Sequence, residues 1–152
     1  EGIPGQGESS AWLVAAIAFS ALIFIAIIGI LAAIAIPQYH DYTIKAKVMG
    51  AMATGNEVKQ RVEQYVLDKR SWPENNADIA LPERVDEKFI EAVSVGSGGT
   101  ITIHLSREIG LTEVKTIVLT PRIDSGNLIW SCDGGTLAAK YLPRECRQGE
   151  VR

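Results

Sequence analysis

The sequence is poor in the residues that carry enzyme chemistry. It holds two histidines and two cysteines among 152 residues. His40 and His104 lack metal-ligand spacing to each other and to the cysteines, so both suit surface positions better than a metal site. There is no P-loop, GxGxxG, HExxH or nucleophile elbow. These absences indicate a protein that is not an enzyme and that uses no cofactor and no metal.

Charge is missing from a long run near the N-terminus. Residues 11–36 contain no charged side chain, and apart from the indole N–H of Trp12 their only polar side chain is Ser20. As a helix, these 26 residues rise about 39 Å, which exceeds the roughly 30 Å hydrocarbon core of a bilayer. Because the run has no polar face, its surroundings must be lipid or other apolar helices. We expect a helix over residues 11–37 that anchors the chain in a membrane.

A strong net charge is also absent. The formal net charge is −3, so the charge balance does not require a nucleic-acid partner. Four basic residues lie near the end of the chain: Lys140, Arg144, Arg147 and Arg152. They could contact phosphates, but Glu145 and Glu150 lie among them, and a solvated tail is the better interpretation. A nucleic-acid partner is conceivable but has no support in the sequence.

Beyond Pro37 the apolar residues become periodic. They recur every three or four positions and form one stripe: Ile44, Val48, Met52, Gly55, Val58, Val62 and Tyr65. Polar residues occupy the other faces, so we expect an amphipathic helix over residues 38–69 that packs on a sheet. Pro37 does not clearly end the apolar helix, and the two halves form one rod. Gly50 and Gly55 each weaken a helix by up to ~1 kcal/mol, and they indicate close packing, a compliant point in the helix or a simple tolerated weakness.

Residues 70–91 form an irregular connection with several breakers, including Trp72-Pro73 and Leu81-Pro82. Strand patterns follow within a sheet region of residues 92–131. The predicted strands are 92–95, 100–106, 115–121 and 127–131. Short turns join them, so we expect an antiparallel meander with one face covering the amphipathic helix.

Both cysteines, Cys132 and Cys146, lie in the last part of the chain. A pair at this spacing, outside any metal signature, is typical of a disulfide in an oxidising compartment. The alternative is two free buried thiols. A bridge closing the loop 132–146 would contribute about 3 kcal/mol in the chain-entropy model.

The N-terminal segment raises a question of orientation. Residues 1–10 are rich in glycine and serine, and we expect them to be flexible. Counting Lys45 and Lys47 beside the apolar run places the larger domain on the inner side of the membrane, against the disulfide argument. The chain does not begin with Met. We expect that a basic leader or a larger N-terminal piece has been removed, which would void the count.

Two stretches resemble a known family. The run AIIGILAAIAIPQYHDYTIKAKV, from Ala26 to Val48, resembles the N-terminal helix of type IV pilins. The tail WSCDGGTLAAKYLPRECR, from Trp130 to Arg147, resembles the disulfide-closed C-terminal loop of that family. The resemblance implies an α+β fold, the pilin ladle. In it a long N-terminal helix packs on a four-stranded antiparallel sheet, and residues 38–152 form the globular head.

The resemblance also implies a function. The chain is expected to be a structural subunit, a major or minor pilin, of a type IV pilus. It would wait in the bacterial inner membrane and then enter an extracellular helical filament of like subunits, with its head periplasmic or extracellular. Its partners would be other pilin subunits, inner-membrane lipid and the pilus assembly machinery, and its roles adhesion, motility or DNA uptake. The residues expected to form the membrane anchor and filament core are Trp12, Phe19, Phe24, Ile27, Ile28, Gly29, Ile30, Leu31, Ile34, Ile36 and Pro37.

The N-terminus departs from the family pattern. Pilins normally have Gly before the cleavage site, an aromatic first mature residue and Glu at the fifth position. Alignment on IIGILAAIAIP puts Ala16 at the first position, after Ala15, and Ser20 at the fifth. Three explanations remain open: a divergent subunit that assembles by apolar packing, an engineered N-terminus, or a membrane-anchored module that does not polymerise and regulates or caps pilus assembly. A nucleic-acid-binding minor pilin and a pseudopilin are further alternatives.

Overall fold

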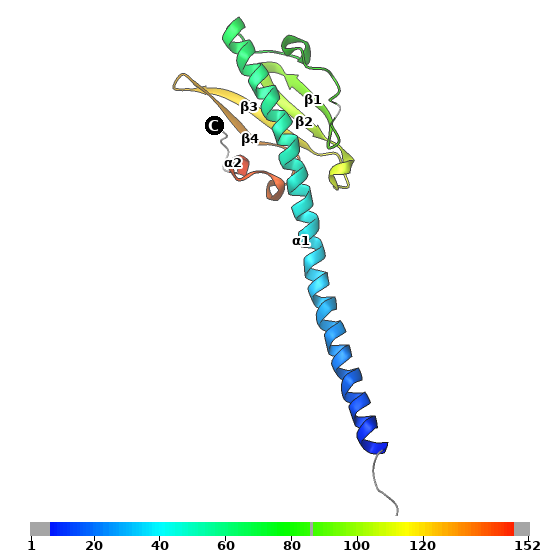
Figure 1. Cartoon of the computed structure of the whole chain (residues 1–152). Coiled ribbons are helices and arrows are strands. Elements are labelled where there is room, and N and C mark those ends of the chain that lie inside the picture. Colours follow the sequence, from blue (N-terminus) through cyan, green and yellow to red (C-terminus); the bar gives the residue numbers. More distant parts are fainter. Residues whose placement is uncertain (1–6, 86, 148–152) are drawn as a thin grey trace, which may run out of the picture. The chain divides into compact units, whose positions relative to one another are not determined.

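The computed structural model describes residues 7–85 and 87–147 (Figure 1). The chain divides into two compact units, Glu1–His40 and Asp41–Arg152. We call the second the head unit. Its elements confirm the predicted α+β class, because a helix packs on an antiparallel sheet that a disulfide-closed segment follows.

One helix, α1, runs from Gly7 to Lys69. It begins earlier than the expected boundary at Ala11, so the expected flexible segment 1–10 is wrong for its last four residues. Residues 8–10 include no glycine or proline, and an acidic residue in a first turn suits the helix dipole. Residues 1–6 of that expected segment lie outside the described residues. Pro37 lies inside α1 and does not end it.

The head unit holds one sheet of four antiparallel strands in the order β1-β2-β3-β4. The strands are β1 Ile90–Gly96, β2 Thr100–Leu105, β3 Thr116–Asp124 and β4 Asn127–Gly135. In β2 the buried and half-buried residues alternate, as the sequence pattern predicts. The core side chains of α1 and of the sheet belong to one buried cluster that includes Trp130.

The last two strands are longer than the sequence pattern predicts. Residue Pro121 was expected to end its strand, yet β3 continues to Asp124. The register of β2 with β3 stops at Leu119, so no β2 residue lies opposite Pro121 and the missing N–H of Pro121 removes no bond to β2. Ser125 and Gly126 both have positive φ, at 50° and 83°, as in the type I′ turn that closes a two-residue hairpin.

The connection after α1 is more ordered than expected. The stretch 70–91 contains a 3-10 helix, η1, over Asn76–Ile79, and its last residues already belong to β1. The Asn76 side chain joins η1 to β1. Its amide nitrogen donates to the Val93 carbonyl at 2.9 Å, and its oxygen accepts from the Val95 N–H at 2.6 Å. Asn76 thus pairs with β1 much as a neighbouring strand would.

Short elements complete the head unit. Further 3-10 turns are η2 Ser97–Gly99, η3 Arg107–Ile109 and η4 Ala139–Tyr141. The helix α2, Arg144–Arg147, follows them and carries the second cysteine. These segments link the strands and return the chain to β4.

Candidate functional site

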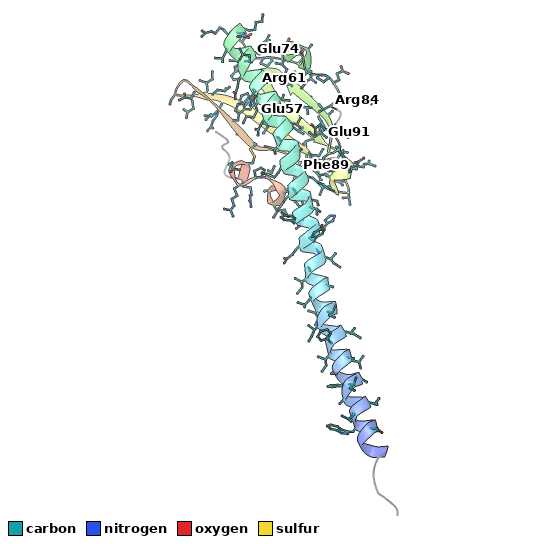
Figure 2. All side chains as sticks on the ribbon, in the orientation of Figure 1. Glu57, Arg61, Glu74, Arg84, Phe89 and Glu91 are labelled. Atoms are coloured by element: carbon teal, nitrogen blue, oxygen red, sulfur yellow. A yellow bond between two sulfur atoms is a disulfide. The ribbon has the colours of Figure 1, made fainter. Side chains whose placement is uncertain are left out.

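The apolar segment of α1, residues 11–36, leaves its large side chains uncovered. Apolar side chains project from this part of the helix on every visible side (Figure 2). Nine residues expected in the anchor are exposed: Trp12, Phe19, Phe24, Ile27, Ile28, Ile30, Leu31, Ile34 and Ile36. A Cβ added at Gly29 would also meet nothing within 4 Å. This surface is therefore free for contact with lipid or with other proteins.

One helix in the described part of the chain is long and apolar enough to cross a membrane. The most apolar window of Ser10–Lys69 has a mean hydropathy of 2.9 and none of it is buried within the structure. Length and composition carry this conclusion. The lack of burial argues against the core helix of a water-soluble domain.

Ser20, the polar side chain inside the apolar segment, is satisfied within its own helix. Its hydroxyl donates to the Ile17 carbonyl at 2.9 Å. This local bond lets a serine face an apolar environment at little cost. Ser20 carries no charge, however, and so it cannot neutralise a cation on another chain.

The stripe that was predicted to pack on the sheet is buried. Ile44, Val48, Met52, Val58 and Val62 belong to the core, and Tyr65 is partly buried against it. Gly55 lies in the same interface. A Cβ there would come within 2.7 Å of Cδ1 of Ile103. Of the explanations for the helix glycines, close packing therefore applies to Gly55, whereas at Gly50 a Cβ would meet nothing within 4 Å.

A polar contact joins α1, near the start of the head unit, to the segment that contains Lys140 and Tyr141. Lys140 Nζ donates to both carboxylate oxygens of Asp41 at 3.1 and 2.9 Å, and the Tyr141 hydroxyl donates to Asp41 Oδ1 at 2.8 Å. The Lys140 hydrogen bond is the main cause that lowers the pKa of Asp41, and the Asp41 hydrogen bond raises the pKa of Lys140. Sequence reasoning placed Lys140 in a solvated tail and missed this pair.

The two cysteines form the predicted disulfide. Cys132 and Cys146 are bonded, with their Cα atoms 4.8 Å apart, and both are buried. The bond ties α2 to β4, and the Asp41 contact ties the intervening segment to α1. The disulfide thus fixes both ends of the loop 132–146, and the Asp41 contact fixes its interior.

A buried cation lies where β4 meets α1. Lys59 is 8% exposed, and its Nζ lies 5.4 Å from the centre of the Trp130 ring. The Trp130 Nε1 donates to Glu63 Oε1 at 2.8 Å. Burial lowers the pKa of Lys59, and the Glu63 charge opposes that shift. Lys59 and Glu63 are among the polar residues outside the apolar stripe, and the sequence pattern did not predict their contacts with Trp130.

The described residues contain no group of three or more His, Cys, Asp or Glu side chains arranged to hold a metal ion.

Comparison with known proteins identifies relatives for most of the chain. A family profile described as Pilin (bacterial filament) matches residues 44–147. The fimbrial protein EcpC of Eikenella corrodens is 35% identical over 131 residues, covering 83% of this chain and 85% of its own length. The type IV major pilin protein PilE1 of Neisseria gonorrhoeae is 33% identical over 147 residues, covering 83% and 88%. A fimbrial protein of Pseudomonas aeruginosa is 49% identical over 123 residues, covering 73% and 79%.

Proposed function

Since this chain belongs to the type IV pilin family, we propose that it is a structural subunit, a major or minor pilin, of a type IV pilus. The observation that supports this most directly is the uncovered apolar segment. A protein that functions as a monomer in water would bury such a surface. A subunit that exchanges lipid for the apolar core of a filament needs it exposed.

The exchange of lipid for a filament core changes the surroundings of the apolar segment little. Lipid tails and bundled apolar helices are both apolar surroundings, so the transfer of the helix between them costs little hydrophobic free energy. Ser20 adds no barrier, because its hydroxyl is already bonded to Ile17. Pro37 lies in the same helix and lacks an N–H. The backbone there is consequently the easiest part of α1 to bend or unwind on assembly.

In this proposal residues 11–37 serve first as inner-membrane anchor and then as filament core, and the head forms the outer wall. The disulfide suits a head that is periplasmic before assembly and extracellular afterwards. The partners are further copies or other pilins, membrane lipid and the assembly machinery. Adhesion, motility or DNA uptake would be functions of the whole filament.

One observation favours a second candidate function. The fifth position of the aligned helix is Ser20, where the family has a glutamate. Residues 11–36 contain no charged side chain. A carboxylate at that depth can pair with an amino terminus of another subunit. Without it, the protein can instead remain in the membrane as an interaction module that regulates or caps pilus assembly and does not polymerise.

The deciding experiment is to shear the cell surface and measure the intact mass of this protein in the sheared and membrane fractions. We expect the protein in sheared filaments that electron microscopy shows. An intact mass that corresponds to a chain starting at Glu1 would mean that assembly proceeds with the extra N-terminal residues. A mass that corresponds to a start inside residues 11–36 would mean that the chain is cleaved within the apolar segment. Retention of all of the protein in the membrane would contradict the filament function and favour the module.

A further inference from the structure

A cleft opens in the head unit between the end of α1 and the tip of the β3–β4 hairpin. Its volume is about 560 Å³. The residues that line it are Glu63, Val66, Leu67, Arg70, Ser71, Trp72, Ile123, Gly126, Asn127 and Leu128. The walls are mainly apolar, with a few polar groups among them, which is the composition of a binding site.

The cleft exists because the apolar face of the hairpin continues beyond its cover. Side chains on β3 alternate, and Ile117, Leu119 and Pro121 point inward and are buried. Ile123 continues the same alternation and pairs with Leu128 across the hairpin, yet it is 62% exposed. Leu67 on α1, which also lines the cleft, is 69% exposed. Apolar walls on both sides thus lack a partner.

A second uncovered surface lies on the opposite side of α1 from the sheet. We call it the outer stripe, and its residues are Tyr42, Ala46, Met49, Gly50 and Ala53. All five are exposed and none carries charge, whereas the same turns bury Ile44 and Val48 against the sheet. Polar residues replace the stripe further along α1, where Glu57 and Arg61 project (Figure 2).

These two surfaces contain four of the five large apolar side chains that are exposed in the described part of the head. In its described residues, the large apolar side chains that remain exposed are Tyr42, Met49, Leu67, Val114 and Ile123. Val114 is set apart between β2 and β3. Of the other four, Leu67 and Ile123 line the cleft, and Tyr42 and Met49 belong to the outer stripe. A single contact between two copies would cover both.

The chemistry of the two surfaces is complementary. Tyr42 is 70% exposed, and tyrosine has an apolar ring and a polar tip, which suits apolar walls with Ser71 and Asn127 beside them. Lys45 follows Tyr42 by one turn. The cleft is lined by one acidic residue, Glu63, and one basic residue, Arg70, so Lys45 must lie at the Glu63 end of the cleft. Opposite charges at these positions would fix the register of the contact.

We propose that the cleft of one copy receives Tyr42 of a second copy, and this inference rests on the proposed filament function. The contact joins different surfaces on the two copies, and it produces an open filament rather than a ring when successive copies are also displaced along the axis. Tyr42 and Leu67 are separated by 25 residues of α1, which is about 37 Å along the helix. Two copies with parallel helices must therefore be displaced by about that distance along the filament axis.

The test is a cysteine cross-link in the full chain. Tyr42→Cys and Leu67→Cys are combined in one chain, the cells are treated with copper phenanthroline, and the sheared fraction is analysed on a non-reducing gel. We expect most of the monomer band to be lost to a ladder of dimers and longer species. Either substitution alone has no partner and should leave no ladder. The matched control combines Tyr42→Cys with Val114→Cys, because Val114 is exposed and apolar but outside both surfaces.

The outcomes separate this contact from the proposed function, because electron microscopy detects filaments independently of the gel. A ladder with the cleft pair and not with the Val114 pair supports the contact. Filaments without a ladder, or with equal ladders for both pairs, overturn the contact and leave the pilin function intact. The absence of both filaments and ladder overturns both. A ladder confined to the membrane fraction also overturns the contact, since copies anchored at one depth lack the required displacement.

Discussion

Gly55 offers a sharp test of how closely α1 approaches the sheet. The perturbation is Gly55→Ala, and the matched control is Gly50→Ala on the same helix. Alanine favours a helix over glycine by about 1 kcal/mol at either position. At Gly50 the new methyl meets nothing within 4 Å, so only this gain applies. We expect Gly50→Ala to be stabilising by up to about 1 kcal/mol.

At Gly55 the same gain is opposed by packing. The added methyl would lie 2.7 Å from Cδ1 of Ile103 and 3.3 Å from Cδ1 of Leu119. Ile103 is fully buried, so its terminal methyl has little space into which to move. Overpacking of this kind costs about 1–3 kcal/mol, and the net effect of Gly55→Ala should be a loss of about 0–2 kcal/mol after the helix gain.

The assay is thermal unfolding of the detergent-solubilised full chain, followed by circular dichroism at 222 nm. One kcal/mol corresponds to about 2–4 °C for a protein of this size, so the two alanine variants should separate by several degrees, with Gly50→Ala the more stable. Equal increases in Tm for both variants would refute the close approach at Gly55. A decrease for Gly50→Ala would show instead that alanine is harmful on this helix for another reason.

Three further predictions concern the polar and covalent contacts of the head. Cys132→Ser should lower Tm, because it removes a bridge that contributes about 3 kcal/mol in the chain-entropy model; an unchanged Tm under non-reducing conditions would contradict a stabilising bridge. The lowered pKa of Asp41 in the folded chain contributes stability above its unfolded pKa, and that stability is lost as pH falls through the folded pKa. Asp41→Asn should therefore flatten the acid side of a Tm profile between about pH 2 and 7, and a profile parallel to that of the unmodified chain would count against the ion pair. Trp130→Phe removes the donor to Glu63 and should cost about 1–3 kcal/mol; a denaturant midpoint equal to that of the unmodified chain would show that this bond adds nothing.

Local patterns were sufficient to predict the long helix and the order of the strands. A run without charge predicts a helix that needs no polar face, and regular spacing from Ile44 to Tyr65 predicts which side meets the sheet. Alternation predicts β2. These features depend on neighbouring residues only, and the structure confirms the fold class that they imply.

Contacts between distant residues could not be predicted in this way. Asp41 and Lys140 are about a hundred positions apart, and only the folded chain brings them together. Lys59 lies outside the apolar stripe, and its contact with the Trp130 ring depends on a residue far along the chain. The end of β3 was misplaced for a different reason. A proline usually stops a strand, but β2 has already ended its pairing with β3 before Pro121.

The pairing of Asn76 with β1 has a consequence for a protein that exists as many copies side by side. An exposed edge strand is a template on which any extended chain can add, and such addition leads to amyloid-like aggregates. The Asn76 amide already occupies the Val93 carbonyl and the Val95 N–H. In every copy Asn76 therefore hinders the addition of another strand along β1. Subunits held close together then associate through helices and side-chain surfaces rather than through backbone ladders. Side-chain contacts can be reversed, whereas backbone ladders seldom are.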